Sequence, residues 1–242
     1  HFRPLCILDS AGKILERIIY QRLNKAIDDA GGLSPNQFGF RKARSTIAAV
    51  NLVKTLAERA ISGKRWKGGK IQYCMVVTLD VKNAFNSASW RSILSALKSF
   101  SVPQYLYNII VSYFEDRTLS YNTSEGSKKY RVSGGVPQGS VLGPLLWNVM
   151  YDGVLRLKVP KNVHIIGFAD DIAVAVIAKH IHDIVSITNR TIVLISDWLE
   201  TNRLNLAESK TEAVLITGRK VREVATFNTK GVSITTQPKL NT

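Results

Sequence analysis

Apolar residues recur at helical spacing through the first quarter of the chain. The first run follows Asp9 or Ser10, either of which can cap a helix, and it ends at Gly31-Gly32. Its apolar stripe consists of Ile14, Leu15, Ile18, Ile19, Leu23, Ala26 and Ile27. A second run covers about residues 46–62, behind Ser45 as its N-cap. Both runs predict amphipathic helices that bury one face.

Shorter apolar runs that are rich in β-branched residues predict buried strands. One such run covers residues 71–79, and two others, 163–166 and 172–177, flank the sequence Gly167-Phe168-Ala169-Asp170-Asp171. Because Gly and Asp are turn residues, the second pair of runs predicts a hairpin with two carboxylates at its tip.

The rest of the chain mixes helices and strands without a regular alternation. Four more helices are predicted, at about residues 90–99, 103–114, 140–157 and 182–201, the first of them behind Ser89 as its N-cap. The further strands are 118–123 and 129–133, joined by a turn at 124–127, and the short segments 204–206 and 213–216. The pattern weakens beyond Gly218. We therefore predict an α+β fold with an antiparallel sheet that helices cover.

Three carboxylates stand at the ends of predicted buried strands. Asp80 follows the strand 71–79, and Asp170 and Asp171 lie at the hairpin. If these strands are neighbours, the three acids meet at one edge of the sheet, where like charges need a cation. Two Mg²⁺ ions roughly 4 Å apart, held by such acids, carry out in-line nucleotidyl transfer. An ordinary polar turn is the alternative for the Asp pair taken alone.

A glycine-rich loop and one aromatic residue are further candidates for ligand contacts. Gly134-Gly135-Val136-Pro137-Gln138-Gly139-Ser140 lets the backbone approach a ligand, and Gln138 can hydrogen-bond a sugar or a base edge. Phe85 can lie under a nucleotide sugar. The alternatives are a simple helix entry for the loop and a core position for Phe85.

The net charge of the 242-residue chain is +15, with 45% hydrophobic residues. This excess favours a polyanionic partner, because binding phosphates releases condensed counterions. A membrane surface is less favoured, since no long apolar span or lipidation motif is present. The basic loop at residues 63–70 fits a linker or a nucleic-acid contact equally well.

The two cysteines, Cys6 and Cys74, lie in apolar surroundings and form no CxxC pair. A disulfide scaffold or a zinc site is therefore not expected, and a reducing compartment fits. The chain starts at His1, and we expect it to be a piece of a longer protein.

Six sequence blocks, in order, resemble the conserved motifs of reverse transcriptases. Phe168-Ala169-Asp170-Asp171 is similar to their Y/F-x-D-D box, and residues 79–86 resemble their first carboxylate motif. The other blocks are Arg3-Pro4-Leu5 with Lys13-Ile14-Leu15-Glu16, Gln37-Phe38-Gly39-Phe40-Arg41, residues 135–144 and residues 205–212. The amino-acid sequences of these blocks are most similar to those of reverse transcriptases from non-LTR (LINE-type) retrotransposons of jockey-like groups, including insect elements that insert into ribosomal DNA.

The resemblance implies the fingers and palm of a right-hand polymerase. The fingers would comprise residues 1–70 and 89–135, the palm residues 71–88 and 136–217, and residues 218–242 would begin a connection to a missing thumb. The family's next block, a hairpin that grips the primer, is not recognisable in the sequence.

The resemblance also implies a role for each site residue. Asp80, Asp170 and Asp171 would hold two Mg²⁺ ions, or Mn²⁺ in their place, with Asp171 more peripheral. Lys210 would lie near the pyrophosphate as a general acid, and Phe85 would exclude a 2′-hydroxyl.

Four further residues would contact the incoming dNTP. Gln138 and Gly139 would contact the nucleotide itself. Arg3 and Arg41 would hold its triphosphate, because the planar guanidinium binds phosphate bidentately.

The implied function is RNA-directed DNA synthesis from an RNA template, a DNA primer and dNTPs. The full protein would use a nicked chromosomal end as its primer, which implies a nuclear site of action, and its RNA–protein complex would also occur in the cytoplasm. An intron-encoded or other cellular reverse transcriptase is one alternative, and a degenerate element protein that only binds RNA is another. The sequence does not define the oligomeric state.

Overall fold

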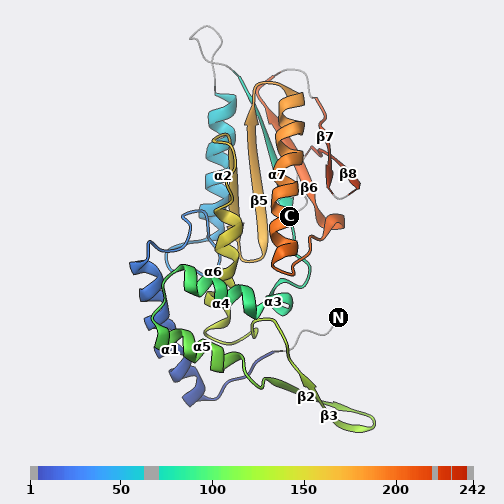
Figure 1. The fold of residues 1–242 in the computed structure, drawn as a ribbon. Helices are drawn as coiled ribbons and strands as arrows, with labels where there is room; N and C mark the ends of the chain where they lie inside the picture. Colours follow the sequence, from blue (N-terminus) through green and yellow to red (C-terminus); the bar gives the residue numbers. More distant parts are fainter. Residues whose placement is uncertain (1–4, 63–70, 220–222, 230, 239–242) are drawn as a thin grey trace. The chain divides into compact units, whose positions relative to one another are not determined.

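The computed structural model describes residues 5–62, 71–219, 223–229 and 231–238 (Figure 1). They divide into two compact units, one formed by residues 1–33 and 83–153 and the other by residues 34–82 and 154–242. Arg3 and the basic loop at 63–70 lie outside the described residues. These units are defined by packing, and the assignment of fingers and palm stays a prediction.

A four-stranded sheet forms the centre of the second unit. Its strands are β1 (Tyr73–Leu79), β4 (Val163–Phe168), β5 (Asp171–Ala178) and β6 (Glu212–Thr217), in the order β4-β5-β1-β6. Each strand pairs antiparallel with its neighbour. The predicted α+β class and the predicted antiparallel sheet are therefore confirmed.

Two helices cover this sheet, α2 (Thr46–Ile61) and α7 (Ile181–Thr201), and Figure 1 shows them on either side of the strands. Cys74 and Val76 of β1 belong to the core cluster that α2 completes. Val77, which points to the opposite face, is also fully buried. Burial on both faces explains why these strands read as continuous apolar runs in the sequence.

Single residues outside the sheet bridge to both of its edge strands. On β4, the Phe38 N–H donates to the Gly167 oxygen at 2.8 Å, and the Gly167 N–H donates to the Asn36 oxygen at 2.9 Å. On β6, the Gln237 N–H donates to the Ala213 oxygen at 2.7 Å. The bridge to β4 also places Gly39, the next residue after Phe38, beside the hairpin between β4 and β5.

The C-terminal part of the second unit holds a hairpin that the sequence pattern did not predict. It consists of β7 (Thr226–Thr229) and β8 (Val232–Thr235). Phe227 is fully buried, and the Asn228 N–H donates to Asn189 Oδ1 of α7 at 2.9 Å. Strands of four residues carry too few alternating positions to stand out in a sequence.

Two local predictions need correction. Residues 204–206 do not form a strand: only Leu206 pairs, in a single bridge to Val81, before the chain enters the short 3₁₀ helix η2 (Glu208–Lys210). The polar hairpin is tighter than predicted, because its second strand already begins at Gly126, whose φ of 112° permits a two-residue turn.

The first unit is mainly helical. Its elements are α1 (Ser10–Asp29), α3 (Ala84–Ser87), α4 (Trp90–Ser99), α5 (Gln104–Phe114), α6 (Gly143–Leu155) and the hairpin of β2 (Thr118–Thr123) and β3 (Gly126–Arg131). The predicted caps are confirmed at Asp9, Ser45 and Ser89, whose side chains each accept a main-chain N–H of the first turn. Among the helices described in either unit, none is long and apolar enough to cross a bilayer.

Gly39 packs so tightly against the β4–β5 hairpin that a larger residue cannot fit. A Cβ at this position would lie 2.1 Å from the Ala169 nitrogen and 2.7 Å from its Cα. Both atoms belong to the backbone of the turn, which cannot move aside as a flexible side chain would.

Gly39→Ala should therefore lower the free energy of unfolding by about 2 kcal/mol, as overpacking of a tight core does. Urea unfolding followed by circular dichroism measures the change. Gly134→Ala is the matched control, because its added Cβ would meet the Ala88 oxygen only at 3.4 Å. An equally small effect at both positions would contradict the close packing of Gly39.

Candidate active site

The pairing of β1 with β5 brings the predicted carboxylates to one end of the sheet. Leu79 pairs with Ile172, so Asp80 and Asp171 are the next residues on two neighbouring strands. Asp170 lies one residue further along, in the turn that joins β4 to β5. The condition for the three acids to meet, that the strand before Asp80 lies beside the hairpin, is thus fulfilled.

The tip of the hairpin is smaller than the sequence suggested. Phe168 pairs with Asp171, so only Ala169 and Asp170 form the turn, and Asp171 is the first residue of β5. Ala169 has a φ of 56°, in the left-handed region, and the small side chain suits both this backbone and the contact with Gly39.

Lys210 reaches the same end of the sheet from η2. Its Nζ lies 2.5 Å from Oδ2 of Asp80 and forms an ion pair with it. The main chain enforces this placement, because the Ala207 N–H donates to the Asp80 oxygen and the Lys82 N–H to the Asn205 oxygen, both at 2.8 Å. The predicted site residues Asp80 and Lys210, 130 positions apart, are in direct contact.

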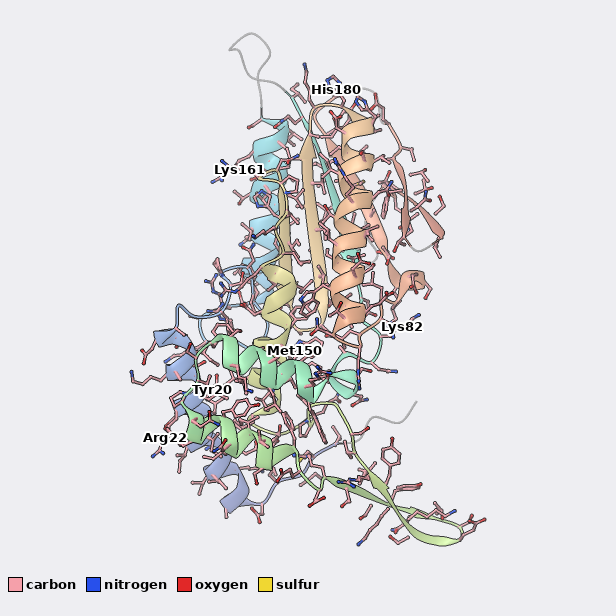
Figure 2. The ribbon with its side chains drawn as sticks, in the orientation of Figure 1. Tyr20, Arg22, Lys82, Met150, Lys161 and His180 are labelled. Atoms are coloured by element: carbon pink, nitrogen blue, oxygen red, sulfur yellow. The ribbon has the colours of Figure 1, made fainter. Side chains whose placement is uncertain are left out.

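A second ion pair lies beside the first. Lys82, labelled in Figure 2 just beyond the end of β1, places its Nζ 3.1 Å from Oε2 of Glu208. A hydrogen bond from the backbone of Glu208 itself lowers the pKa of this carboxyl group, and the hydrogen bond from Lys82 lowers it further. The side chain of Lys82 is 55% exposed and that of Glu208 is 25% exposed, so solvent screens the pair and it contributes little to stability.

The electrostatics of Asp171 reflect a crowded anionic site. Although part of this residue is exposed, burial of its carboxyl group raises its pKa, and the charges of Asp170 and Asp80 raise it further. Lys210 opposes the increase. The negative charges at this edge are therefore close enough to destabilise one another, and a cation bound among them would relieve the repulsion.

The donor set fits a hard divalent cation, because Asp80, Asp170 and Asp171 offer only carboxylate oxygens. Within the described ranges, no three Asp, Glu, His or Cys side chains are already gathered as ligands. Asp80 also forms the ion pair with Lys210. The individual roles as metal ligands stay predictions.

Arg41 fixes the loop that leads to Gly39. Its Nη1 donates to the main-chain oxygens of Ser34 at 2.6 Å and Gln37 at 3.3 Å. These bonds hold the side chain beside residues 34–37, and its predicted contact with a triphosphate stays a prediction. The same holds for Arg3, which is not among the described residues.

In the first unit, Phe85 rests on a stack of aromatic rings. Its ring centroid lies 5.3 Å from that of Trp147, which lies 5.1 Å from that of Tyr151. The Val136 N–H donates to the Phe85 oxygen at 2.7 Å, so the glycine-rich loop starts directly beside this residue. Phe85 is half-buried, which leaves part of its ring accessible.

The loop around Gln138 is held at its main chain. The Cys6 N–H donates to the Gln138 oxygen at 2.7 Å, and Leu5 bridges to the same residue. Gly139 has a φ of 96°, and a Cβ there would lie 2.7 Å from the Cys6 oxygen. Glycine is thus required at 139, while the contacts of Gln138 and Gly139 with a nucleotide stay predictions.

Glu16 ends the block Lys13-Ile14-Leu15-Glu16 that resembles a reverse transcriptase motif, but the sequence predicted no contacts for it. It is 5% exposed, and it lies on the same buried face of α1 as Ile19, Leu23 and Ile27. The predicted stripe was partly wrong, because Ile14, Leu15 and Ile18 are exposed. An acid at helical spacing from three apolar residues was the available signal.

Comparisons with known proteins agree with the geometry. The family model described as "Reverse transcriptase (RNA-dependent DNA polymerase)" matches residues 1–236. The Pol polyprotein of the type-1 retrotransposable element R1 of Bradysia coprophila is 29% identical over 217 residues, which cover 90% of this chain and 20% of that protein. The probable RNA-directed DNA polymerase of transposon BS of Drosophila melanogaster is 33% identical over 178 residues, with 71% and 19% covered.

Solved structures show the same fold at low sequence identity. Telomerase from Candida tropicalis superposes with a TM-score of 0.63 at 12% identity, over 84% of this chain and 33% of that chain. This chain spans about a fifth of the length of the curated relatives. Its relatives include the reverse transcriptases of the non-LTR elements R1, jockey and X-element. The chain belongs to the reverse transcriptase (RNA-dependent DNA polymerase) family.

Proposed function

We propose that the protein is the RNA-directed DNA polymerase of a non-LTR retrotransposon, which extends a primer 3′-hydroxyl with dNTPs on an RNA template. The observation that supports this most directly is the set of three aspartates at one end of the sheet, with Lys210 bonded to Asp80. Family membership makes this arrangement the expected polymerase centre.

Asp80 and Asp170 would hold two Mg²⁺ ions, and Asp171 would support them from the periphery. Such ions lower the pKa of the attacking hydroxyl and bind the leaving pyrophosphate. Lys210, whose side chain is 68% exposed, would be the proton donor for that leaving group. Its ion pair with Asp80 keeps the ammonium group at the centre before a substrate arrives.

Selection of the nucleotide would fall to Phe85, Gln138 and Gly139 of the first unit and to two arginines. Phe85 would contact the deoxyribose and exclude a 2′-hydroxyl, while Gln138 and Gly139 would contact the nucleotide. Arg41, together with Arg3, would hold the triphosphate. The aromatic stack beneath Phe85 supports this proposal, because it restricts the ring to one orientation.

RNA and DNA are the macromolecular partners in this proposal, and the net charge of +15 supports them. We place the site of action in the nucleus, at a nicked chromosomal end. The names of the relatives favour a mobile element over an intron-encoded or other cellular enzyme. A protein that has decayed to RNA binding alone is the second candidate, and intact Asp80, Asp170 and Asp171 speak against it.

Asp170→Asn should reduce primer extension on an RNA template by about a thousandfold, because it removes one metal ligand from the transition state. RNA binding should change little, since only one charge is lost. Single-turnover extension and a filter-binding titration measure the two effects. Asp183→Asn removes the same charge from the first turn of α7 and is the control. Undiminished synthesis by Asp170→Asn would refute the metal assignment, and an inactive wild type that binds RNA would favour the decayed element.

Phe85→Val should allow ribonucleotides into the product, because the smaller side chain no longer meets a 2′-hydroxyl. The ratio of kcat/KM for dNTP to that for rNTP should fall by about tenfold or more. Phe85→Tyr keeps the ring and should keep the selectivity. If Phe85→Val retained wild-type selectivity, Phe85 would be a packing residue only.

Mg²⁺ should stabilise the protein, because burial and the charges of Asp170 and Asp80 raise the pKa of Asp171, and a bound cation would stabilise its carboxylate form. At about ten times its dissociation constant the ion should add about 1.4 kcal/mol. For a domain of this size that gain corresponds to a rise in Tm of about 4 °C. The double variant Asp80→Asn, Asp170→Asn should lose the shift in a thermal-melting titration. An equal shift in that variant would place the ion elsewhere.

A further inference from the structure

Glu16 joins helix α1 to the end of the Gln138 loop within the first unit. Its Oε2 accepts the Val141 N–H at 2.6 Å and the Leu142 N–H at 3.0 Å. These two amides directly precede α6, which starts at Gly143. A residue 125 positions away therefore fixes the point at which the loop becomes a helix.

The other carboxylate oxygen is bonded as well. Oε1 accepts the hydroxyl of Tyr113 in α5 at 3.0 Å. Burial raises the pKa of Tyr113 to about 12, so this hydroxyl keeps its proton. Both oxygens thus have donors, which prevents the side chain from rotating away from the loop.

Between Pro137 and α6, the internal bonds of the loop involve Ser140, whose Oγ donates to the Pro137 oxygen at 3.0 Å. Pro137 has no N–H, and the turn bond from the Ser140 N–H to the Pro137 oxygen is long at 3.4 Å. Ser140 Oγ accepts the Gly143 N–H at 2.9 Å and thereby caps α6. The amides of Val141 and Leu142 lie between these bonds, and Leu142 is fully buried. Without Glu16 they would lose their acceptor, and the loop would shift to find another.

An apolar residue would suit position 16 better if packing were its only task. The neighbouring positions of the buried stripe, Ile19, Leu23 and Ile27, are all apolar. A buried carboxylate costs desolvation, which only well-placed donors offset. The bonds to the loop and to Tyr113 are therefore what a carboxylate at position 16 provides.

We propose that Glu16 is a positioning residue that sets the orientation of the Gln138 loop for the incoming nucleotide. The proposal rests on the proposed polymerase function. Two of the bonds that hold the loop come from elements distant in sequence: the Cys6 N–H donates to the Gln138 oxygen at 2.7 Å, and Glu16 accepts the N–H groups of Val141 and Leu142. Glu16 contacts no reacting atom and acts through the main chain of the loop.

Three variants of Glu16 in the full-length protein distinguish the effect of its side-chain length from the effect of its charge. Glu16→Gln keeps an oxygen at the same distance, Glu16→Asp keeps the charge on a shorter side chain, and Glu16→Ala removes the acceptor. Asp29→Ala is the control, because Asp29 is an exposed acid of the same helix that pairs only locally with Lys25.

Glu16→Ala and Glu16→Asp should raise the KM for dNTP by about tenfold and change kcat much less, because the loop contacts the nucleotide equally in the ground and transition states. Glu16→Gln should stay within about threefold of the wild type, as its oxygen still accepts both amides. Hydrogen–deuterium exchange of the peptide 137–145 should accelerate in the first two variants and not in Asp29→Ala, while peptides of β1 remain protected.

Unchanged KM and unchanged exchange in Glu16→Asp and Glu16→Ala would overturn the proposal. So would faster exchange throughout the chain with equal losses in kcat and Tm, because that result describes a purely structural residue. A wild type that makes no DNA would instead overturn the proposed function and the nucleotide role with it, and the exchange data would still decide whether Glu16 restrains the loop.

Discussion

The antiparallel register between β1 and β5 is the constraint on which the candidate active site depends. With Leu79 opposite Ile172, Asp80 and Asp171 follow as neighbours. A slip of one residue would turn the apolar side chains of either strand to the wrong face, so the core on both sides of the sheet holds the register. The three aspartates can lie together at the end of the strands because the free energy gained by packing the rest of the sheet offsets their electrostatic repulsion.

Lys210 shows how the chain manages that repulsion. The bridge between Val81, just after β1, and Leu206, just before η2, places η2 beside the end of β1. Lys210 of η2 thereby meets Asp80. The same main-chain bonds would position an ammonium group whether or not an ion is bound. The fold therefore supplies the acidic edge together with the positive charge of Lys210, although Asp80 and Lys210 are 130 positions apart in sequence.

Much of this fold could be predicted because its signals are local. The caps at Asp9, Ser45 and Ser89 and the β-branched runs around Asp170 each depend on neighbouring residues alone, and the structure bears them out. The contacts of Glu16 escaped prediction because its partners, Tyr113, Val141 and Leu142, are distant in sequence. The β7–β8 hairpin escaped it because each strand is short and gains its burial from α7. The exposure of Ile14 and Leu15 likewise depends on which face of α1 its neighbours cover.

The single-residue bridges at the two edge strands have a consequence for how copies of this protein behave toward one another. An open sheet presents rows of backbone donors and acceptors on which a foreign strand can grow. Here Asn36 and Phe38 engage both polar groups of Gly167 on β4, and Gln237 engages the oxygen of Ala213 on β6. These bonds interrupt the ladder on each side, so a second chain cannot extend the sheet in register past them. The loop that seats Gly39 against the hairpin thus also protects the protein against lateral aggregation.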